Sequence, residues 1–380
     1  MKKTLLTICL VWMCFSLSAQ KIIDLSGKWS FSIDRQDNGE KEKWFSHTLN
    51  DFINLPGSMP EKLKGDEVTA KTQWTGSLYD SSYYYNPYME KYRKEGNIKF
   101  PFFLTPDKHY VGAAWYQKEV NIPADWKGER ILLFLERPHI ETTVWVNGQK
   151  TGMQNSLCVP HQYDITHYVR PGKCTITIRV DNRIKEINVG PDSHSITDQT
   201  QGNWNGIVGR ICLQTTPKTY FDDIQIYPEP EQKLARVKVV IKGTGTAKVK
   251  LSAESFNTDK KHIVPAIQQE IKLNKGVTET EMVLPMGNDM LLWDEFHPAL
   301  YKLKAEVTNG KKTEIKEIQF GIRRFEIKGK WFYVNGRKTQ LRGTVENCDF
   351  PLTGYAPMDV ESWERVFRIC RSYGLNHMRF

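Results

Sequence analysis

Short runs in which apolar and polar residues alternate fill most of the first two thirds of the chain. Residues 174–182 are the clearest case, because the apolar positions 176, 178 and 180 alternate with polar neighbours. A period of two is typical of a β-strand with two unlike faces. Strands are also predicted at residues 29–33, 53–58, 114–120 and 142–146. Residues 130–136 are nearly continuous apolar, which is typical of a strand buried on both faces. Many short strands separated by turn residues predict a two-sheet sandwich over residues 20–219.

A second β-rich stretch follows a linker marked by Pro228 and Pro230. Its strand candidates are residues 236–241, 247–253, 268–273, 278–283, 301–307 and 312–319, with Asn309-Gly310 joining the last two. About a hundred residues with six or seven short strands indicate an immunoglobulin-like sandwich over residues 220–322. The Cys-Trp-Cys spacing of antibody domains does not occur in it.

The pattern changes in the last fifty residues. Residues 331–334 and 337–341 flank Asn335-Gly336, the signal of a two-residue turn, which predicts a hairpin, and residues 341–343 are expected to end a strand. Asp359 can cap a helix whose apolar face recurs at positions 363, 366, 367 and 370. Gly374 is expected to end this helix, and a strand begins at Asn376. Strand, helix and strand in succession predict a right-handed crossover and a parallel pair.

A parallel pair needs cover on both faces, and a (β/α)₈ barrel takes roughly 250 residues. Residues 323–380 are therefore interpreted as the first βα unit of a TIM barrel cut short at Phe380. The alternative is a small α+β cap that is complete as it stands.

Composition restricts the class of protein. The chain has 380 residues, with 12% aromatic side chains that include eleven Trp and sixteen Tyr, which indicates folded domains rather than disorder. The net charge of +9 comes from scattered basic residues without a clustered stripe, so a nucleic-acid partner is not predicted. The cysteines outside the leader are far apart and form no C-x-x-C pair. Neither a disulfide framework nor a zinc site is indicated, and no cofactor or metal-ligand cluster is predicted.

The first nineteen residues have the pattern of a secretory signal peptide. Lys2 and Lys3 precede an apolar run over residues 5–17, and Ser18 and Ala19 are small enough for cleavage. The apolar run is shorter than the roughly 20 residues that a membrane span requires. We therefore expect an exported protein, periplasmic or extracellular, without a stable membrane span.

Residues 73–112 interrupt the rhythm of strands with an insertion rich in tyrosine and phenylalanine. A loop of this length is usually functional or disordered, and its aromatic content argues against disorder. One interpretation is a platform that stacks on sugar rings. The other is that these rings anchor the insertion to the sandwich.

A set of short motifs runs in a fixed order along nearly the whole chain. They are Leu25-Ser26-Gly27-Lys28-Trp29-Ser30-Phe31, Leu55-Pro56-Gly57, Gly112-Ala113-Ala114-Trp115-Tyr116, Thr143-Val144-Trp145-Val146-Asn147-Gly148, Asp164-Ile165-Thr166, Trp204-Asn205-Gly206-Ile207, Phe320-Gly321-Ile322-Arg323, Val334-Asn335-Gly336, Leu341-Arg342-Gly343 and Gly374-Leu375-Asn376-His377-Met378-Arg379. Together they resemble the amino-terminal part of glycoside hydrolase family 2, the β-galactosidase, β-glucuronidase and β-mannosidase family. Each motif alone is weak evidence for this resemblance, but the occurrence of all of them in this order is specific.

The resemblance implies a mainly β chain: a jelly-roll sugar-binding sandwich, an immunoglobulin-like sandwich and the start of the barrel that carries catalysis. It also implies a retaining mechanism in which two carboxylates about 5.5 Å apart act as acid/base and nucleophile. In the family both are glutamates late in the barrel, beyond residue 380, so no glutamate of this chain inherits either role. Some relatives use a metal ion.

Five residues become candidates for substrate binding through the resemblance. Arg379 matches the family arginine at the end of the second barrel strand, where a guanidinium holds a carboxylate ionised; the alternative is an ordinary ion pair at a strand end. Glu346 lies in the loop after the first barrel strand and could touch substrate, although it matches no catalytic glutamate. Asn347 falls where many relatives have a histidine near the sugar, which puts galactose-type contacts in doubt.

The other two candidates, Asp198 and Asn203, precede the Trp204-Asn205-Gly206 motif. Family members reach the barrel pocket with an acidic or amide residue from this loop, but the spacing here matches imperfectly. For Asp198 the alternative is a turn-forming side chain.

We therefore expect an exported β-galactosidase-like glycoside hydrolase whose partner is an oligosaccharide or polysaccharide, represented by a fragment that is inactive without its catalytic glutamates. The sequence indicates no oligomeric state. A second hypothesis is a secreted, non-catalytic carbohydrate-binding protein, and a third is a scaffold or adhesin made of sandwich domains.

Overall fold

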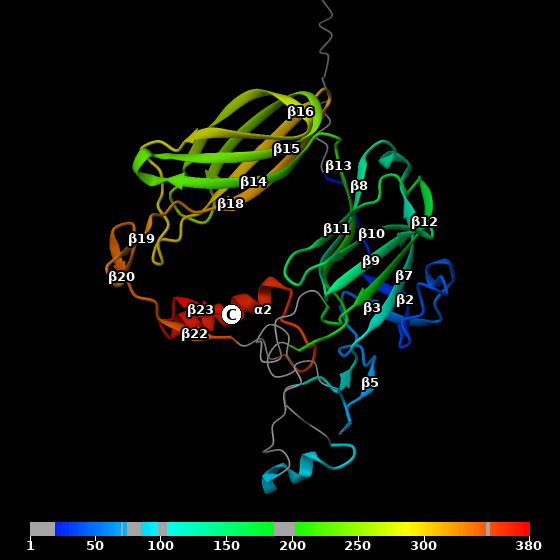
Figure 1. Cartoon of the computed structure of the whole chain (residues 1–380). Coiled ribbons are helices and arrows are strands. Elements are labelled where there is room, and N and C mark those ends of the chain that lie inside the picture. The colour runs from blue at the N-terminus through cyan, green and yellow to red at the C-terminus, as the bar shows by residue number, and fades with distance from the viewer. Residues whose placement is uncertain (1–19, 70, 74–84, 98–104, 186–201, 347–349) are drawn as a thin grey trace, which may run out of the picture. The chain divides into compact units, whose positions relative to one another are not determined.

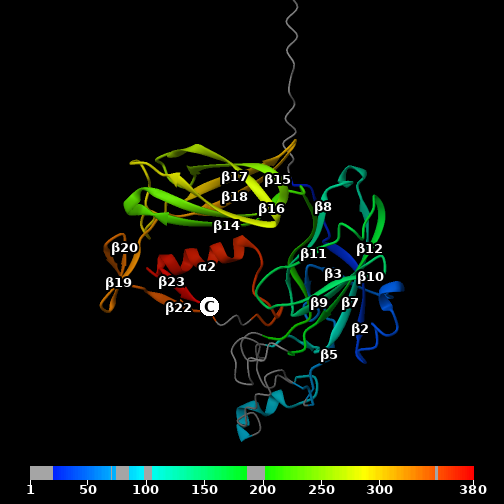
Figure 2. The ribbon, with the colours of Figure 1, turned by 45° about the horizontal axis from the view of Figure 1, so that its top comes forward.

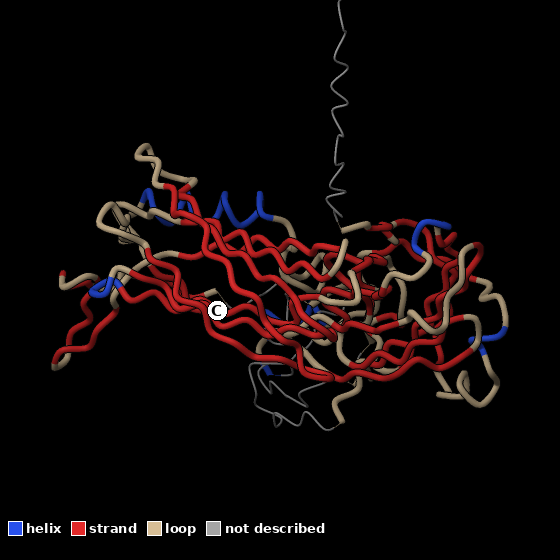
Figure 3. Tube along the Cα trace, turned by 90° about the horizontal axis from the view of Figure 1, so that it is seen from above, coloured by secondary structure: helices blue, strands red, loops and turns tan. Residues whose placement is uncertain are grey.

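Strands make up most of the protein (Figures 1 and 3). The computed structural model describes residues 20–69, 71–73, 85–97, 105–185, 202–346 and 350–380. These residues form two units, one of residues 217–325 and the other of residues 21–216 together with residues 326–380. The mainly β fold with two successive sandwiches is confirmed.

Residues 21–216 fold as a sandwich of two antiparallel sheets. The first sheet has the order β1-β13-β8-β11, with β4 on the edge of β13: β1 Ile22–Asp24, β13 Gly206–Thr216, β8 Arg130–Pro138, β11 His161–Asp164 and β4 Gly57–Ser58. The second has the order β10-β9-β12-β7-β2-β3: β10 Gln149–Asn155, β9 Glu141–Val146, β12 Gly172–Asp181, β7 Ala113–Ile122, β2 Gly27–Asp34 and β3 Asp51–Leu55. Between neighbouring elements lie the two-residue strands β5 Asp66–Glu67 and β6 Lys108–His109, and the 3₁₀ turns η1 Trp44–Ser46, η2 Pro87–Tyr92 and η3 Ala124–Trp126.

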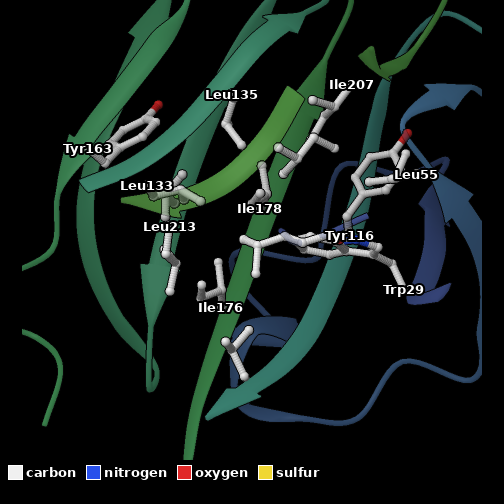
Figure 4. Close-up of a cluster of buried hydrophobic side chains, with 14 of the residues drawn as sticks. Trp29, Leu55, Tyr116, Leu133, Leu135, Tyr163, Ile176, Ile178, Ile207 and Leu213 are labelled. Atoms are coloured by element: carbon white, nitrogen blue, oxygen red, sulfur yellow. Dashed lines mark hydrogen bonds between the residues drawn. The ribbon is translucent and has the colours of Figure 1, made fainter. Parts of the chain in front are cut away.

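The alternating positions of the strands form the core between the two sheets (Figure 4). Trp29, Tyr116 and Ile178 of the second sheet lie opposite Leu133 and Leu213 of the first, and each is at most 1% exposed. Fully burying one such side chain contributes about 1.5–3 kcal/mol relative to leaving it exposed. This contiguous cluster is the main source of stability of the sandwich.

The outer face of the second sheet is also covered, which the alternation alone did not indicate. Phe45 of η1 stacks on Trp145 with ring centroids 5.1 Å apart, and Trp145 contacts Trp115 at 5.0 Å. Thr177 and Arg179 therefore lie buried although they point away from the core. The segment around η1, which is mostly polar in sequence, turns its aromatic residues onto the sheet.

Residues 217–325 form a five-stranded antiparallel unit (Figures 1 and 2). The strands are β14 Tyr220–Glu229, β15 Leu234–Ser255, β16 Ile263–Pro285, β17 Tyr301–Asn309 and β18 Lys312–Phe320, with the turn η4 Pro230–Gln232 after β14. The prediction of six or seven short strands is wrong here, because β15 and β16 each unite two predicted strands. Gly243 and Gly245 of β15 and Gly276 of β16 have positive φ, which lets both strands bend without ending.

The last residues contain a hairpin and a strand–helix–strand unit. The elements are β19 Phe325–Lys328, β20 Trp331–Val334, β21 Arg337–Thr339, β22 Gly343–Val345, α2 Val360–Ser372 and β23 His377–Arg379. Asn335 and Gly336 both have positive φ, as the predicted hairpin turn requires. Asp359 accepts a bond from the Ser362 N–H and caps α2, and Gly374 follows its end with φ of 76°.

Strands β22 and β23 pair in parallel, as predicted. One detail is wrong: residues 341–343 do not end a strand, because β22 begins at Gly343. Instead, the Arg342 N–H donates to the Asn376 side-chain oxygen, and the Arg342 carbonyl accepts from the Asn376 N–H. Both bonds lie just before the ladder of β22 and β23 begins. No residue of α2 is buried, and Phe367 of its apolar face is 43% exposed.

Candidate functional site

Two predicted site residues lie together at the carboxyl ends of the parallel strands. Val345 pairs with Arg379 in the ladder, and the Glu346 N–H donates to the Arg379 carbonyl at 2.8 Å. Arg379 is exposed and Glu346 is half-buried. Because side chains at the carboxyl ends of parallel strands share one edge, the carboxylate of Glu346 and the guanidinium of Arg379 belong to the same edge of this pair.

The opposite ends of the same two strands are fixed by Arg342. Its backbone N–H donates to Asn376 Oδ1 at 2.8 Å, and its Nε donates to the Gly374 carbonyl at 2.7 Å. The Asn376 Nδ2 also donates to the Gln340 carbonyl at 3.1 Å. These bonds hold the register of β22 and β23, and so the relative position of Glu346 and Arg379.

Asn203 belongs to a buried network of three asparagines at one end of the sandwich. Its Nδ2 donates to the Asn182 carbonyl at 2.9 Å, and the Asn182 side chain binds both Tyr110 and Gly112. Asn205 donates to the Gly112 carbonyl at 2.9 Å and to the Val180 carbonyl at 3.0 Å. All three side chains donate to buried backbone carbonyls, and Asn182 also accepts from the Gly112 N–H.

Trp204 lies between Asn203 and Asn205 and is 3% exposed. It stacks on His139, with ring centroids 4.5 Å apart and planes 21° apart, and it contacts Tyr355 at 5.4 Å. The Tyr355 hydroxyl donates to Glu61 Oε2 at 2.9 Å. The segment that joins β22 to α2 is thereby attached to the sandwich.

A groove of about 700 Å³ lies beside this attachment, within the unit of residues 21–216 and 326–380. Its walls are mostly apolar and come from both parts of that unit: Pro56, Glu136, Gly209, Arg210, Phe350, Pro351, Leu352, Thr353, Tyr355, Pro357, Met358, Asp359 and Ser362. Arg210 Nε lies 3.2 Å from Glu136 Oε2. Although burial opposes it, hydrogen bonds from Arg210 hold the pKa of Glu136 below its usual value. An apolar groove with a few fixed polar groups is typical of a ligand site.

A second, strongly polar cavity of about 590 Å³ opens on the outer face of the six-stranded sheet. Its charged groups are paired: Arg179 and Arg183 both contact Asp37 at 2.6 Å, and Lys185 lies 2.8 Å from Glu141. Asp181, which is fully buried, binds Arg183 at 2.6 Å. Burial by itself would raise the pKa of Asp181, but hydrogen bonds from Arg183 and Lys185 outweigh it and hold this pKa well below its usual value.

The structure therefore brings together two of the five predicted site residues, Glu346 and Arg379. Asn203 lies elsewhere in the same unit, in the sandwich, and is 7% exposed. Asp198 and Asn347 lie outside the described residues. Contact of any of the five with a substrate stays a prediction.

Sequence reasoning did not find the residues of the groove or of the attachment. Glu61 and Tyr355 are separated by 294 positions, so no local pattern connects them. Among the described residues of this part of the sandwich, only Asn203, which precedes the Trp204 motif, was a site candidate from the sequence.

Among the described residues, no group of three or more histidine, cysteine, aspartate or glutamate side chains could hold a metal ion. Within the same ranges, no helix is long and apolar enough to cross a membrane. Cys158, Cys174, Cys212 and Cys370 are all free thiols.

Comparison with known protein families shows which family this chain belongs to. The family model described as "Glycosyl hydrolases family 2, sugar binding domain" matches residues 22–217, and the one described as "Glycosyl hydrolases family 2" matches residues 219–323. The chain belongs to glycosyl hydrolase family 2. The sandwich of residues 21–216 is thus the sugar-binding domain of this family.

Relatives in family 2 share about a quarter of their residues with this chain. A β-galactosidase of Thermoanaerobacter pseudethanolicus is 25% identical over 74% of the chain and 38% of its own length. The human β-glucuronidase is 24% identical over 94% of the chain and 53% of its own length. The crystal structure of a β-glucuronidase from Ruminococcus gnavus superposes with a TM-score of 0.67 at 19% identity, covering 95% of the chain and 55% of that structure. The chain spans about half the length of such relatives or less.

Proposed function

We propose that the whole protein is an exported retaining β-glycosidase that releases a terminal sugar from a β-linked oligosaccharide or polysaccharide. The observation that supports this most is the unbroken succession of two family 2 matches over residues 22–323, followed by a parallel strand–helix–strand unit. In this proposal β22, α2 and β23 open the catalytic barrel, and the two catalytic glutamates lie outside these 380 residues.

The proposed mechanism gives Arg379 and Glu346 supporting roles. A retaining glycosidase needs a nucleophilic carboxylate that stays ionised, about 5–5.5 Å from the acid/base carboxyl group. The guanidinium of Arg379, at the carboxyl end of β23, would hold such a carboxylate by charge-assisted hydrogen bonds and lower its pKa. Glu346, at the end of β22, would accept hydrogen bonds from sugar hydroxyls.

The groove of about 700 Å³ would take the part of the substrate away from the cleaved bond. Its apolar wall, formed largely by residues 350–358, suits the C–H face of a sugar or an apolar aglycone. The Glu136–Arg210 pair at the wall offers both acceptors and donors to hydroxyl groups.

Chromogenic β-galactoside, β-glucuronide and β-mannoside test this function directly. Protein from the complete reading frame should turn over one of them, and NMR should show the β-anomer of the released sugar first. The 380-residue chain alone should be inactive. Turnover by that chain at enzyme-like rates would show that its catalytic carboxylates lie within residues 1–380, against the proposal.

Two arginine variants, compared in the active protein, test the proposed role of Arg379. Arg379→Ala should reduce kcat by two or more orders of magnitude in the active protein. Arg368→Ala is the matched control, because Arg368 is an exposed arginine of α2 paired only loosely with Glu364 at 3.9 Å. Equal activity of the two variants would argue against a catalytic partner for Arg379.

A second candidate function, glycan binding without catalysis, is favoured by the aromatic insertion. Tyr85, which precedes η2, and Tyr88, which lies in it, are 83% and 84% exposed. Exposed rings of this kind can stack on sugars. If this function is correct, the 380-residue chain binds a glycan on an array and the Tyr85→Ala/Tyr88→Ala variant does not.

A further inference from the structure

Three consecutive residues in the segment that joins β22 to α2 are held by the sugar-binding sandwich. The Ser58 hydroxyl donates to the Thr353 carbonyl, and the Tyr355 hydroxyl donates to Glu61 Oε2 at 2.9 Å. Both partners on the sandwich belong to one short stretch after β3. The contacts therefore join two segments of one unit that lie almost 300 positions apart in the chain.

The partner groups on the sandwich are themselves fixed. Glu61 Oε1 lies 2.6 Å from Lys62 Nζ, and the Glu61 N–H donates to the Ser58 Oγ at 3.2 Å. The same Glu61 carboxylate accepts from the Ser58 N–H at 3.3 Å. Burial and the bond to Glu61 raise the pKa of Tyr355 well above its usual value, so its hydroxyl remains a donor throughout the physiological range.

The remaining contact joins Gly354 to the side chain of Trp204. Gly354 has φ of +82°, and a Cβ placed on it would lie 3.4 Å from Trp204 Cβ. Trp204 is in turn held by its stack on His139. A glycine allows the positive φ of this turn beside the indole, and the ring of Tyr355 also contacts Trp204, with centroids 5.4 Å apart.

We propose that Tyr355, Glu61 and Trp204 form a positioning device, which we call the loop anchor, through which the sugar-binding sandwich fixes the first βα loop of the catalytic barrel. The loop begins at Glu346, at the carboxyl end of β22, and ends at the Asp359 cap of α2. Since loops at these ends of barrel strands carry substrate-contacting residues, the anchor fixes residues 353–358 of this loop relative to bound sugar. Its kinetic consequence rests on the proposed function.

Hydrogen exchange of the 380-residue chain tests the anchor without any activity. The Gly354 N–H donates to the Phe350 carbonyl at 2.7 Å and reports on the loop. Tyr355→Phe removes the bond to Glu61 and should speed exchange of residues 353–358 about tenfold, while the β7 and β12 amides of the sandwich are unchanged. Tyr373→Phe is the matched control, because Tyr373 is 82% exposed. Equal exchange in both variants would overturn the inference.

Two substitutions of Glu61, one that keeps a hydrogen-bond acceptor and one that removes it, distinguish loss of the loop anchor from a general loss of folding. Glu61→Gln keeps an acceptor for the Tyr355 hydroxyl and should exchange within twofold of the unmodified chain. Glu61→Ala should match Tyr355→Phe, and combining these two should add little, because both remove one bond. Additive effects, or loss of protection in Glu61→Gln, would count against the anchor.

Kinetics of protein from the complete reading frame give the second readout. If substrate binds only when the loop is anchored, KM should rise in inverse proportion to the anchored fraction measured by exchange, with kcat unchanged within twofold. Tyr355→Ala, which also removes the ring from Trp204, should raise KM most. A fall in kcat at constant KM would indicate a loss of folded enzyme instead and would overturn the inference. If no protein shows turnover, the proposed function fails, and the exchange results still decide on the anchor.

Discussion

Acidification from pH 7 to pH 5 should destabilise the sandwich of residues 21–216, because two of its histidines are buried in the neutral form. His139 is 4% exposed, and burial together with the charge of Arg137 lowers its pKa from 6.5 to about 3. His161 is fully buried, and burial lowers its pKa to about 4. Between pH 4 and 6.5 the unfolded chain therefore binds more protons than the folded one, so stability falls as the pH falls.

The size of the effect follows from the two pKa values. On unfolding, each histidine regains a pKa near 6.5 and is protonated at pH 5, whereas in the folded protein both remain neutral there. Linkage then gives a loss of about 2 kcal/mol for each histidine between pH 7 and pH 5, or about 4 kcal/mol for the pair. This is a large part of the total stability of a domain, which is about 5–15 kcal/mol.

Urea unfolding followed by tryptophan fluorescence measures this loss, since Trp29, Trp115, Trp126, Trp145 and Trp204 are all buried in the sandwich. His161→Asn supplies the comparison. The Asn oxygen can take the place of Nδ1, which lies 2.6 Å from the Thr142 hydroxyl, but an amide does not titrate. In this variant the loss should shrink to about 2 kcal/mol. A loss below about 1 kcal/mol in the unmodified chain, or one that His161→Asn leaves unchanged, would refute the reasoning.

Three further outcomes test other parts of the structure. Leu213→Ala, at a fully buried core position, should lower the free energy of unfolding of the sandwich by about 2–5 kcal/mol in urea titrations. Asp181→Asn should cost on the order of 3 kcal/mol in the same titrations, because Arg179 would lose a buried ionic partner; no change would mean that the ion network contributes little. Asp359→Ala should weaken α2 by about 1 kcal/mol, seen as faster hydrogen exchange over its first turn, because the Ser362 N–H loses its acceptor.

Several elements could be read from the sequence because their causes are local. The alternation at residues 174–182 marks β12, Asn335-Gly336 marks the hairpin between β20 and β21, and Asp359 and Gly374 mark the ends of α2. Each depends on the conformational preference of one residue or on a period within a few residues. The same locality explains the error in β15, where glycines that usually interrupt a strand instead bend one that neighbouring strands hold together.

One part of the candidate site could likewise be predicted from the sequence, and another part could not. That Glu346 and Arg379 share an edge follows from two strands in parallel, which the sequence predicts through the helix between them. The ion network around Asp181 and the loop anchor do not follow from any local signal. Arg179 contacts Asp37, which is 142 positions away in the sequence, and Tyr355 contacts Glu61, which is 294 positions away.

The sequence by itself thus determined the order and type of most elements, the family and two neighbouring residues of the candidate site. Which loops cover which face, and which distant side chains share a buried bond, was decided only by the tertiary structure. The physical reason is that a strand's period says which residues share a face, whereas the partners of that face depend on how whole sheets stack and how loops fold back on them.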